Sequence, residues 1–168
     1  MDRTMVGPRR EHVAQSDAPA ARLVCEALEY ETTAAPEFID ITDDVRRVVE
    51  QAGIAFGQVT VFSQHTTAAI KINEAEPLLL QDLARTLRQF APPNAYYEHN
   101  DFSRRTVNMN EDECANGHAH CQHLFLSASE TVPVIDGRLA MGQWQSIFLI
   151  ELDHPRLRRV LVNVIGTS

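Results

Sequence analysis

The chain has 168 residues, of which 44% are hydrophobic and 23% are charged, and its formal net charge at pH 7 is -8. This length suits one domain, and the composition is that of an ordinary soluble globular protein. The acidic balance argues against nucleic acid as the main ligand, because phosphate backbones select basic surfaces. No apolar run approaches the roughly 20 residues that a membrane-spanning helix needs. We therefore expect neither a nucleic-acid partner nor a membrane partner.

The cysteines give no sign of a disulfide framework. They number three, at Cys25, Cys114 and Cys121, and none belongs to a C-x-x-C pair. The N-terminal segment is charged and lacks the apolar core of a secretory signal. Reduced thiols are typical of the cytoplasm. We predict a cytoplasmic protein with free thiols.

The N-terminal part of the chain contains one segment without periodicity. Residues 1–21 mix Pro, Arg, Glu, Ser and Ala, and we predict a flexible tail there. Residues 22–168 are then expected to form a single domain. Alternation predicts strands over residues 23–30 and 38–41. Residues 42–53 have an N-cap threonine, an apolar face and a final glycine, which together predict an amphipathic helix.

The middle of the chain is predicted to contain two strands, one helix and one long loop. Residues 54–63 and 68–72 have strand patterns. Residues 77–90 begin with proline, which the first turn of a helix accepts, and carry a leucine stripe that we expect to face the core. Residues 94–113 are polar and aperiodic. A loop of this length within a compact domain is usually functional or disordered, and its Tyr-Tyr-Glu-His sequence favours function.

The C-terminal part is predicted to be mostly β-structure. A helix is expected over residues 116–127, with Asn116 as its N-cap. Asp136-Gly137 is a strong signal for a tight hairpin between two strands. The expected strands cover residues 131–135, 138–141, 143–152 and 158–165. The sequence as a whole thus indicates an α+β fold with largely antiparallel sheets.

Three of the seven histidines stand in stretches that are rich in other polar residues. His65 lies between two predicted strands, His99 follows two tyrosines in the long loop, and His120 lies near the start of the predicted helix. The group around His118 and His120 lacks the ligand spacing of a self-contained zinc site. One histidine from each stretch would instead build an open three-histidine metal site. His154 precedes a proline in a predicted turn and is expected to be solvated.

Carboxylates accompany these histidines at Glu74, Glu98 and Asp101. Such groups can perform general acid–base catalysis or coordinate a divalent metal. Carboxylates near turns also serve as caps and as acceptors of loop hydrogen bonds. The residues alone leave both interpretations open. The chain has no Gly-x-Ser-x-Gly motif and no glycine-rich nucleotide loop, so a serine hydrolase of that type is not indicated.

Five motifs in fixed order resemble the YjbQ family, which is also called UPF0047. The resemblance extends from about Leu23 to Gly166, and the combination is far more specific than any single motif. In chain order the motifs are Gln64-His65-Thr66-Thr67-Ala68-Ala69-Ile70-Lys71-Ile72-Asn73-Glu74, Tyr97-Glu98-His99, Asn116-Gly117-His118-Ala119-His120, Val132-Pro133-Val134 with Asp136-Gly137, and Gly142-Gln143-Trp144-Gln145-Ser146-Ile147.

The resemblance implies a single α+β domain with antiparallel, sandwich-like sheets that assembles as a homotrimer. It implies secondary thiamine-phosphate synthase activity and a histidine-rich pocket that holds a metal or a phosphate-like anion. Matched by motif, the expected metal ligands are His65, His99 and His120. The expected catalytic residues are Glu74, His99 and Asp101. The expected ligand-binding residues are His65, Asn73, Asn116 and His120.

Three functions remain open at this point. The first is a transferase that joins hydroxymethylpyrimidine diphosphate to thiazole phosphate, with zinc or magnesium neutralising the departing pyrophosphate. The second is a metal-dependent hydrolase of another small substrate, with three histidine ligands and Glu74 as the base. The third is a non-enzymatic trimer that binds a small anion. The chain departs from the family pattern at Gln143, where threonine is usual, and more mildly at Thr67, where serine is usual.

Overall fold

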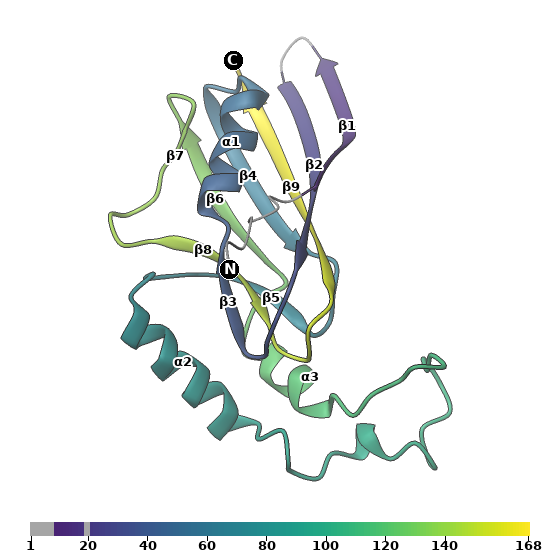
Figure 1. The fold of residues 1–168 in the computed structure, drawn as a ribbon. Coiled ribbons are helices and arrows are strands. Elements are labelled where there is room, and N and C mark those ends of the chain that lie inside the picture. Colours follow the sequence, from purple (N-terminus) through teal and green to yellow (C-terminus); the bar gives the residue numbers. More distant parts are fainter. Residues whose placement is uncertain (1–8, 19–20) are drawn as a thin grey trace, which may run out of the picture.

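Two antiparallel sheets and three α-helices make up the part of the chain that the structure describes (Figure 1). The structure is a computed structural model that describes the backbone of residues 9–18 and 21–168, and the side chains of residues 21–168. The strands are β1 (Arg9–Ala18), β2 (Ala21–Glu31), β3 (Glu37–Asp40), β4 (Phe56–Ser63), β5 (Ala68–Asn73), β6 (Ser129–Ile135), β7 (Arg138–Leu139), β8 (Ser146–Glu151) and β9 (Leu157–Thr167). The helices are α1 (Thr42–Ala52), α2 (Pro77–Phe90), the short 3-10 helix η1 (Glu98–Asn100) and α3 (Gly117–His123).

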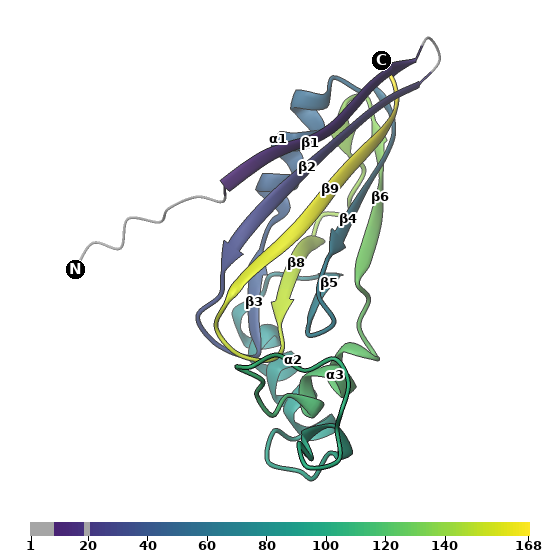
Figure 2. The same ribbon diagram turned by 90° about the vertical axis from the view of Figure 1, so that its right-hand side faces the viewer.

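The sheets differ in size and share one core. The larger has six strands in the order β1-β2-β9-β4-β6-β7, and the smaller has three in the order β3-β8-β5. Figure 2 shows the long strands β2, β9 and β4 running side by side, with α2 and α3 below them. Every strand pair is antiparallel. This arrangement confirms the predicted α+β class with antiparallel sheets.

The main core lies between the two sheets and α1. Strand β9 alternates buried and half-buried residues along most of its length, so that Val160, Val162 and Val164 point inward. Helix α1 contributes its predicted apolar face, including Val45 and Val48, which are fully buried. Burial of such side chains is the principal favourable contribution to folding. The alternation of apolar and polar residues in the sequence therefore places the apolar side chains in the core.

Local sequence signals end two of the elements as expected. Gly53 follows α1 with a φ of 63°, a left-handed conformation that glycine adopts without steric penalty. Asp136 and Gly137 have φ values of 51° and 73°, as a tight hairpin between β6 and β7 requires. Both signals are confirmed.

Two predictions about the ends of the chain and its elements need correction. Residues 9–18 form β1, which pairs with β2, within the segment predicted to be a flexible tail. The tail was predicted because this segment has no apolar periodicity. Backbone pairing with β2 does not require such periodicity. The remainder of that segment, residues 1–8 and 19–20, lies outside the described residues. Helix α3 ends at His123, four residues before the predicted end.

Helix α2 has the predicted bounds but not the predicted burial. Its N-terminus is capped by the Glu76 carboxylate, which accepts hydrogen bonds from the backbone of Leu78 at 2.9 Å and Leu79 at 2.7 Å. None of its residues is fully buried, and Phe90 is 51% exposed. The helix lies beside the outer face of the smaller sheet (Figure 1). The leucine stripe, predicted as core, is thus only half covered within one chain.

Among the described residues, no helix is long and apolar enough to cross a membrane.

A buried ion pair joins the ends of several strands. The Arg158 guanidinium donates to both carboxylate oxygens of Glu151, with a distance of 2.6 Å from Nε to Oε2. The side chains are 2% and 0% exposed. Arg158 also donates to Thr67 Oγ1 at 3.1 Å, and Glu151 accepts from Thr32 Oγ1 at 2.9 Å. These contacts connect the start of β5, the end of β8 and the segment after β2 to the start of β9.

We expect Glu151→Gln to lower the free energy of unfolding by about 3–5 kcal/mol, because it leaves a buried guanidinium without a counter-charge. Urea denaturation of the variant and the parent at equal protein concentration measures this difference. Asp82→Asn is the matched control, since it removes an ion pair with Arg85 whose side chains are 63% and 56% exposed. That change should leave the unfolding midpoint essentially where it was. Equal midpoints for both variants would contradict the role given to the buried pair.

Candidate functional site

Three of the predicted functional residues, His99, Asn116 and His120, lie where η1, α3 and the β8–β9 turn (residues 152–156) meet. The backbone nitrogen of Gly117 donates to Asn100 Oδ1 at 2.9 Å, which fixes η1 against the start of α3. A Cβ on Gly117 would lie 2.6 Å from Cβ of Tyr97, so only glycine permits this approach. The rings of His99 and His120 are consequently adjacent, with centroids 4.7 Å apart.

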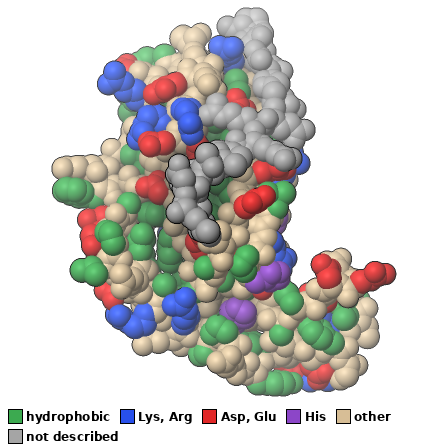
Figure 3. Space-filling model, viewed as in Figure 1, with side chains coloured by type: hydrophobic (Ala, Val, Ile, Leu, Met, Phe, Trp, Pro, Cys, Tyr) green, Lys and Arg blue, Asp and Glu red, His purple; other side chains and the backbone are tan. Residues whose placement is uncertain are grey.

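We call His99, His118, His120 and Asp153 the histidine cluster. Figure 3 shows histidine side chains close together in the lower half of this face of the molecule. Burial lowers the pKa of His120, and the neighbouring His99 lowers this pKa further while Asp153 opposes the shift. Burial likewise lowers the pKa of His118. Both imidazoles are therefore neutral at pH 7, the form that accepts protons and binds metals.

Several buried polar atoms of this region have no hydrogen-bond partner among the described residues. They are His99 Nε2, His118 Nδ1 and Asn116 Oδ1. The other polar atom of the Asn116 amide, Nδ2, donates to Asp153 Oδ2 at 3.3 Å. Buried polar groups are nearly always paired in folded proteins. Their concentration at one junction makes this region the candidate ligand site.

Asp153 is the buried centre of the region, with a side chain only 3% exposed. Burial raises its pKa, but hydrogen bonds from His154 and Asn116 and the charge of Arg156 outweigh burial, so that its pKa lies below the usual value. Asp153 is thus a carboxylate at neutral pH. Arg156 donates to its Oδ2 at 2.7 Å. Asp153 could not be selected from the sequence, because nothing around residue 153 distinguishes it from an ordinary turn aspartate.

His65 is bonded to the start of β9 rather than to η1 or α3. Its Nε2 accepts a hydrogen bond of 2.8 Å from the backbone nitrogen of Arg159. Burial lowers the pKa of His65, and the charge of Arg158 adds to this effect. A neutral imidazole whose Nε2 accepts must carry its proton on Nδ1. His65 therefore offers a hydrogen-bond donor, which suits an anion better than a metal ion.

The three histidines predicted as metal ligands do not form a ready-made site within one chain. Among the described side chains, the group whose metal-ligating atoms all lie within 4.8 Å of one another is Cys114, Asp153 and His154. His99 and His120 are adjacent, but His65 is not part of such a group. The three-histidine ligand set stays a prediction. His154, expected to be solvated, is instead half-buried in contact with Asp153 at 3.0 Å.

Asn73 and Glu74 lie at the other end of β5 from His65. In the smaller sheet Asn73 is opposite Ser146, whereas Ala68 is opposite Glu151. Five residues of strand separate these ends by about 17 Å. Asn73 Oδ1 accepts from the Glu74 backbone at 2.9 Å, and both residues are exposed. One chain alone therefore does not bring them to the histidine cluster.

Asp101 makes local hydrogen bonds of the kind that turns use. Its Oδ1 accepts from the backbone nitrogen of Ser103 at 3.1 Å and from Ser103 Oγ at 2.6 Å. Its Oδ2 lies 3.7 Å from the guanidinium of Arg104. The capping alternative, which the sequence left open, accounts for these contacts.

An apolar cavity of about 110 Å³ lies between α2 and the smaller sheet. It is distinct from the histidine cluster, and no histidine lines it. The lining residues are Phe38, Lys71, Asn73, Leu83, Thr86, Leu87, Leu126, Phe148 and Ile150. Asn73, predicted as a ligand-binding residue, is thus at the rim of this apolar space.

Known proteins with the same sequence motifs share the architecture. Residues 26–167 match the family described as "UPF0047 protein YjbQ-like". A UPF0047 protein of Methanothermobacter thermautotrophicus is 43% identical, over 84% of this chain and 91% of its own length. The UPF0047 protein YugU of Bacillus subtilis is 33% identical, over 84% of this chain and 98% of its own length.

Solved structures agree with the sequence matches. A YbjQ-like protein of unknown function from Sulfolobus solfataricus superposes with a TM-score of 0.78 at 35% identity, covering 87% of this chain and 99% of that chain. A hypothetical protein from Aeropyrum pernix superposes with a TM-score of 0.75 at 31% identity, covering 84% of this chain and 98% of that chain. The motifs, the profile match and the shared fold agree, and the chain belongs to the YjbQ-like family of UPF0047 proteins.

Proposed function

We propose that the histidine cluster binds a small phosphorylated molecule and catalyses a reaction in which its imidazoles accept or return protons. The observation that carries this proposal is the set of buried, unpartnered atoms at the junction of η1 and α3: His99 Nε2, His118 Nδ1 and Asn116 Oδ1. An unpaired buried polar group costs about 1–3 kcal/mol, so a ligand that pairs several of them gains affinity. Catalytic sites commonly keep such groups in the absence of substrate.

The positive group next to the cluster is Arg156, which pairs with the Asp153 carboxylate. The side chain of Arg156 is 37% exposed and can supply a positive charge at the β8–β9 turn. His65 contributes a donor on Nδ1, and its pKa is influenced by Arg156, which places it in the same electrostatic environment. Neutral imidazoles of low pKa act as general bases at neutral pH. These features support phosphate recognition combined with proton transfer.

The specific reaction that the family resemblance implies is secondary thiamine-phosphate synthesis. It requires neutralisation of a pyrophosphate leaving group, which Arg156 favours. A divalent metal would be held by His99 and His120, because the buried Nε2 of His99 lacks a partner and the two rings are adjacent. When bound, such an ion withdraws charge from phosphate oxygens. A hydrolase of another small phosphate ester would use the same groups, with water in place of the second substrate.

We expect His99→Ala and His120→Ala each to weaken pyrophosphate binding by roughly tenfold or more, equivalent to about 1.4 kcal/mol. Each change removes a nitrogen of the cluster. Isothermal titration calorimetry with pyrophosphate measures the affinity, and circular dichroism verifies that the fold is intact.

Asp101→Asn is the matched comparison, because it preserves the turn acceptor Oδ1 and lies outside the cluster. It should leave the pyrophosphate affinity unchanged. Unchanged affinity in both histidine variants would contradict the proposed site. Binding without turnover of either the two thiamine precursors or simple phosphate esters would identify a non-enzymatic anion-binding protein.

We also propose that the chain assembles as a homotrimer through the apolar surface of α2 and α3. Large side chains are exposed there or nearby, and Phe90 and Phe125 contact each other with ring centroids 4.1 Å apart. Contiguous exposed apolar surface commonly marks a subunit interface. The exposed side chains are Leu78 and Phe90 on α2 and Leu124 and Phe125 directly after α3, and Trp144 is exposed in the segment before β8.

Light scattering at micromolar concentration should give a mass three times that of the 18.9 kDa chain. Phe125→Asp should shift the mass toward that of one chain, because a desolvated carboxylate disfavours an apolar interface. Val107→Asp, at an exposed position in the loop before α3, is the control and should remain trimeric. A parent protein with the mass of one chain would exclude the trimer.

A further inference from the structure

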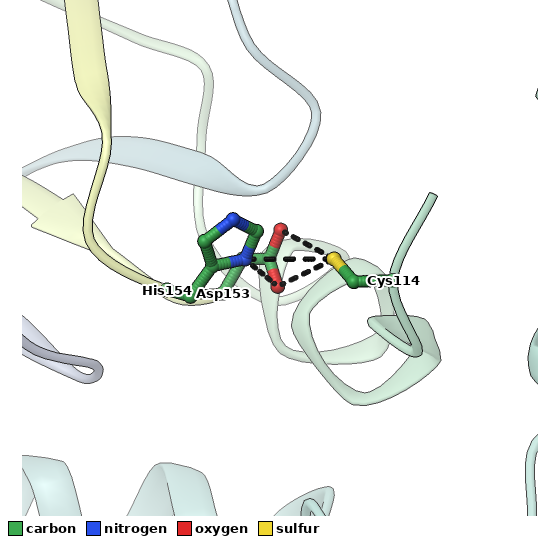
Figure 4. Close-up of side chains that lie close together, drawn as sticks. All are labelled: Cys114, Asp153 and His154. Atoms are coloured by element: carbon green, nitrogen blue, oxygen red, sulfur yellow. Dashed lines mark hydrogen bonds and ion pairs between the residues drawn. The ribbon is translucent and has the colours of Figure 1, made fainter. Parts of the chain in front are cut away.

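Three side chains of different metal-ligating types meet beside the histidine cluster. Figure 4 shows Cys114, from the loop before α3, facing Asp153 and His154 of the β8–β9 turn. The Cys114 sulfur lies 3.5 Å from His154 Nδ1, and 3.9 Å and 4.0 Å from the two Asp153 carboxylate oxygens. His154 Nδ1 lies 3.0 Å from Asp153 Oδ1. All three residues are half-buried.

These separations match the dimensions of a tetrahedral zinc site. Zinc–ligand bonds of about 2.0–2.3 Å at tetrahedral angles place sulfur, nitrogen and oxygen ligands about 3.4–3.6 Å apart. The observed separations of 3.0 to 4.0 Å bracket this value. We propose that Cys114, Asp153 and His154 bind a thiophilic divalent metal ion such as Zn²⁺.

The Cys114 thiol adds little to the hydrogen bonding between Asp153, His154 and Arg156. The sulfur–oxygen distances of 3.9 Å and 4.0 Å are at the limit for a thiol donor, which is a weak donor in any case. The positive charge in front of the three groups comes from Arg156. Its guanidinium lies 2.7 Å from Asp153 Oδ2, 2.7 Å from His154 Nδ1, 2.5 Å from His154 Nε2 and 3.8 Å from the Cys114 sulfur. Arg156 thus supplies the positive charge that the three groups face, and a metal ion would have to take its place.

The donor set selects the class of metal. A thiolate with an imidazole suits zinc or cobalt, whereas Mg²⁺ and Ca²⁺ prefer oxygen ligands alone. Coordination replaces the thiol proton of Cys114, which passes to the solvent, and Arg156 moves outward because its side chain is partly exposed. Three protein ligands leave a fourth position open, as in catalytic zinc sites.

The site goes beyond the proposed function, because neither Cys114 nor His154 belongs to the histidine cluster. The metal site and the histidine cluster share only Asp153. A metal here would tie the long loop before α3 to the β8–β9 turn and would stand next to the imidazoles. The same ion would therefore order the loop and add a Lewis acid at the edge of the phosphate site.

Titration with Co²⁺ tests the site on the intact chain. A thiolate ligand produces a sulfur-to-cobalt charge-transfer absorption in the near ultraviolet, which histidine and carboxylate ligands do not. We expect this absorption to saturate at one equivalent of Co²⁺ in the parent protein. It should be lost in Cys114→Ser and retained in Cys121→Ser, which removes an exposed thiol on α3. Its absence from the parent, or its survival in Cys114→Ser, would overturn the proposal.

Two further variants separate this site from the histidine cluster. His154→Ala should weaken Co²⁺ binding by roughly tenfold or more, measured by competition with a chelator. His99→Ala should keep the charge-transfer absorption while losing pyrophosphate affinity, so that failure of one proposal leaves the other intact. An absorption that depends on His99 but not on His154 would place the thiolate in a different ligand set and refute the proposed one.

Discussion

The buried ion pair between Arg158 and Glu151 holds the candidate site in place. Glu151 Oε1 accepts hydrogen bonds from the backbone nitrogens of Leu152 at 3.1 Å and Asp153 at 2.9 Å. The same carboxylate is clamped by Arg158, which also donates to Thr67, two residues after His65. A buried pair of this kind tolerates little displacement, because an unpaired buried charge is strongly unfavourable. The position of Asp153 is therefore set by the core rather than by the turn in which it lies.

Much of the fold could be predicted because it depends on local signals. Alternating apolar residues located β9 and β4, Gly53 located the end of α1, and Asp136-Gly137 located the β6–β7 hairpin. Each signal acts within a few residues, through backbone conformation or one buried face. β1 could not be predicted in this way, because its sequence has no apolar alternation and the strand is formed by its pairing with β2.

The candidate site was harder to predict from the sequence than the fold, because it is formed by residues that are distant in the chain. His99 and His120 could be selected from their polar surroundings, and the structure places their rings together. Asp153, Cys114 and His154 gave no comparable signal, since the contact between Cys114 and His154 joins residues 40 positions apart. Asn73 and Glu74 illustrate the opposite error of treating one continuous motif as one site. When a motif spans a whole strand, its two ends lie about 15 Å or more apart, so its residues need not belong to one site.

The burial of α2 and the geometry of the site are connected through Gln122. Its side-chain nitrogen donates to the carbonyl oxygens of Leu87 at 3.2 Å and Ala91 at 3.0 Å, at the C-terminal end of α2. Gln122 lies on α3, two residues after His120, and is almost fully buried. A partner subunit that covers the half-exposed face of α2 would therefore also restrain α3, and with it the imidazole of His120. If the chain assembles through α2 as proposed, these two hydrogen bonds would couple assembly to the site geometry, because the interface would restrain an imidazole that it does not touch.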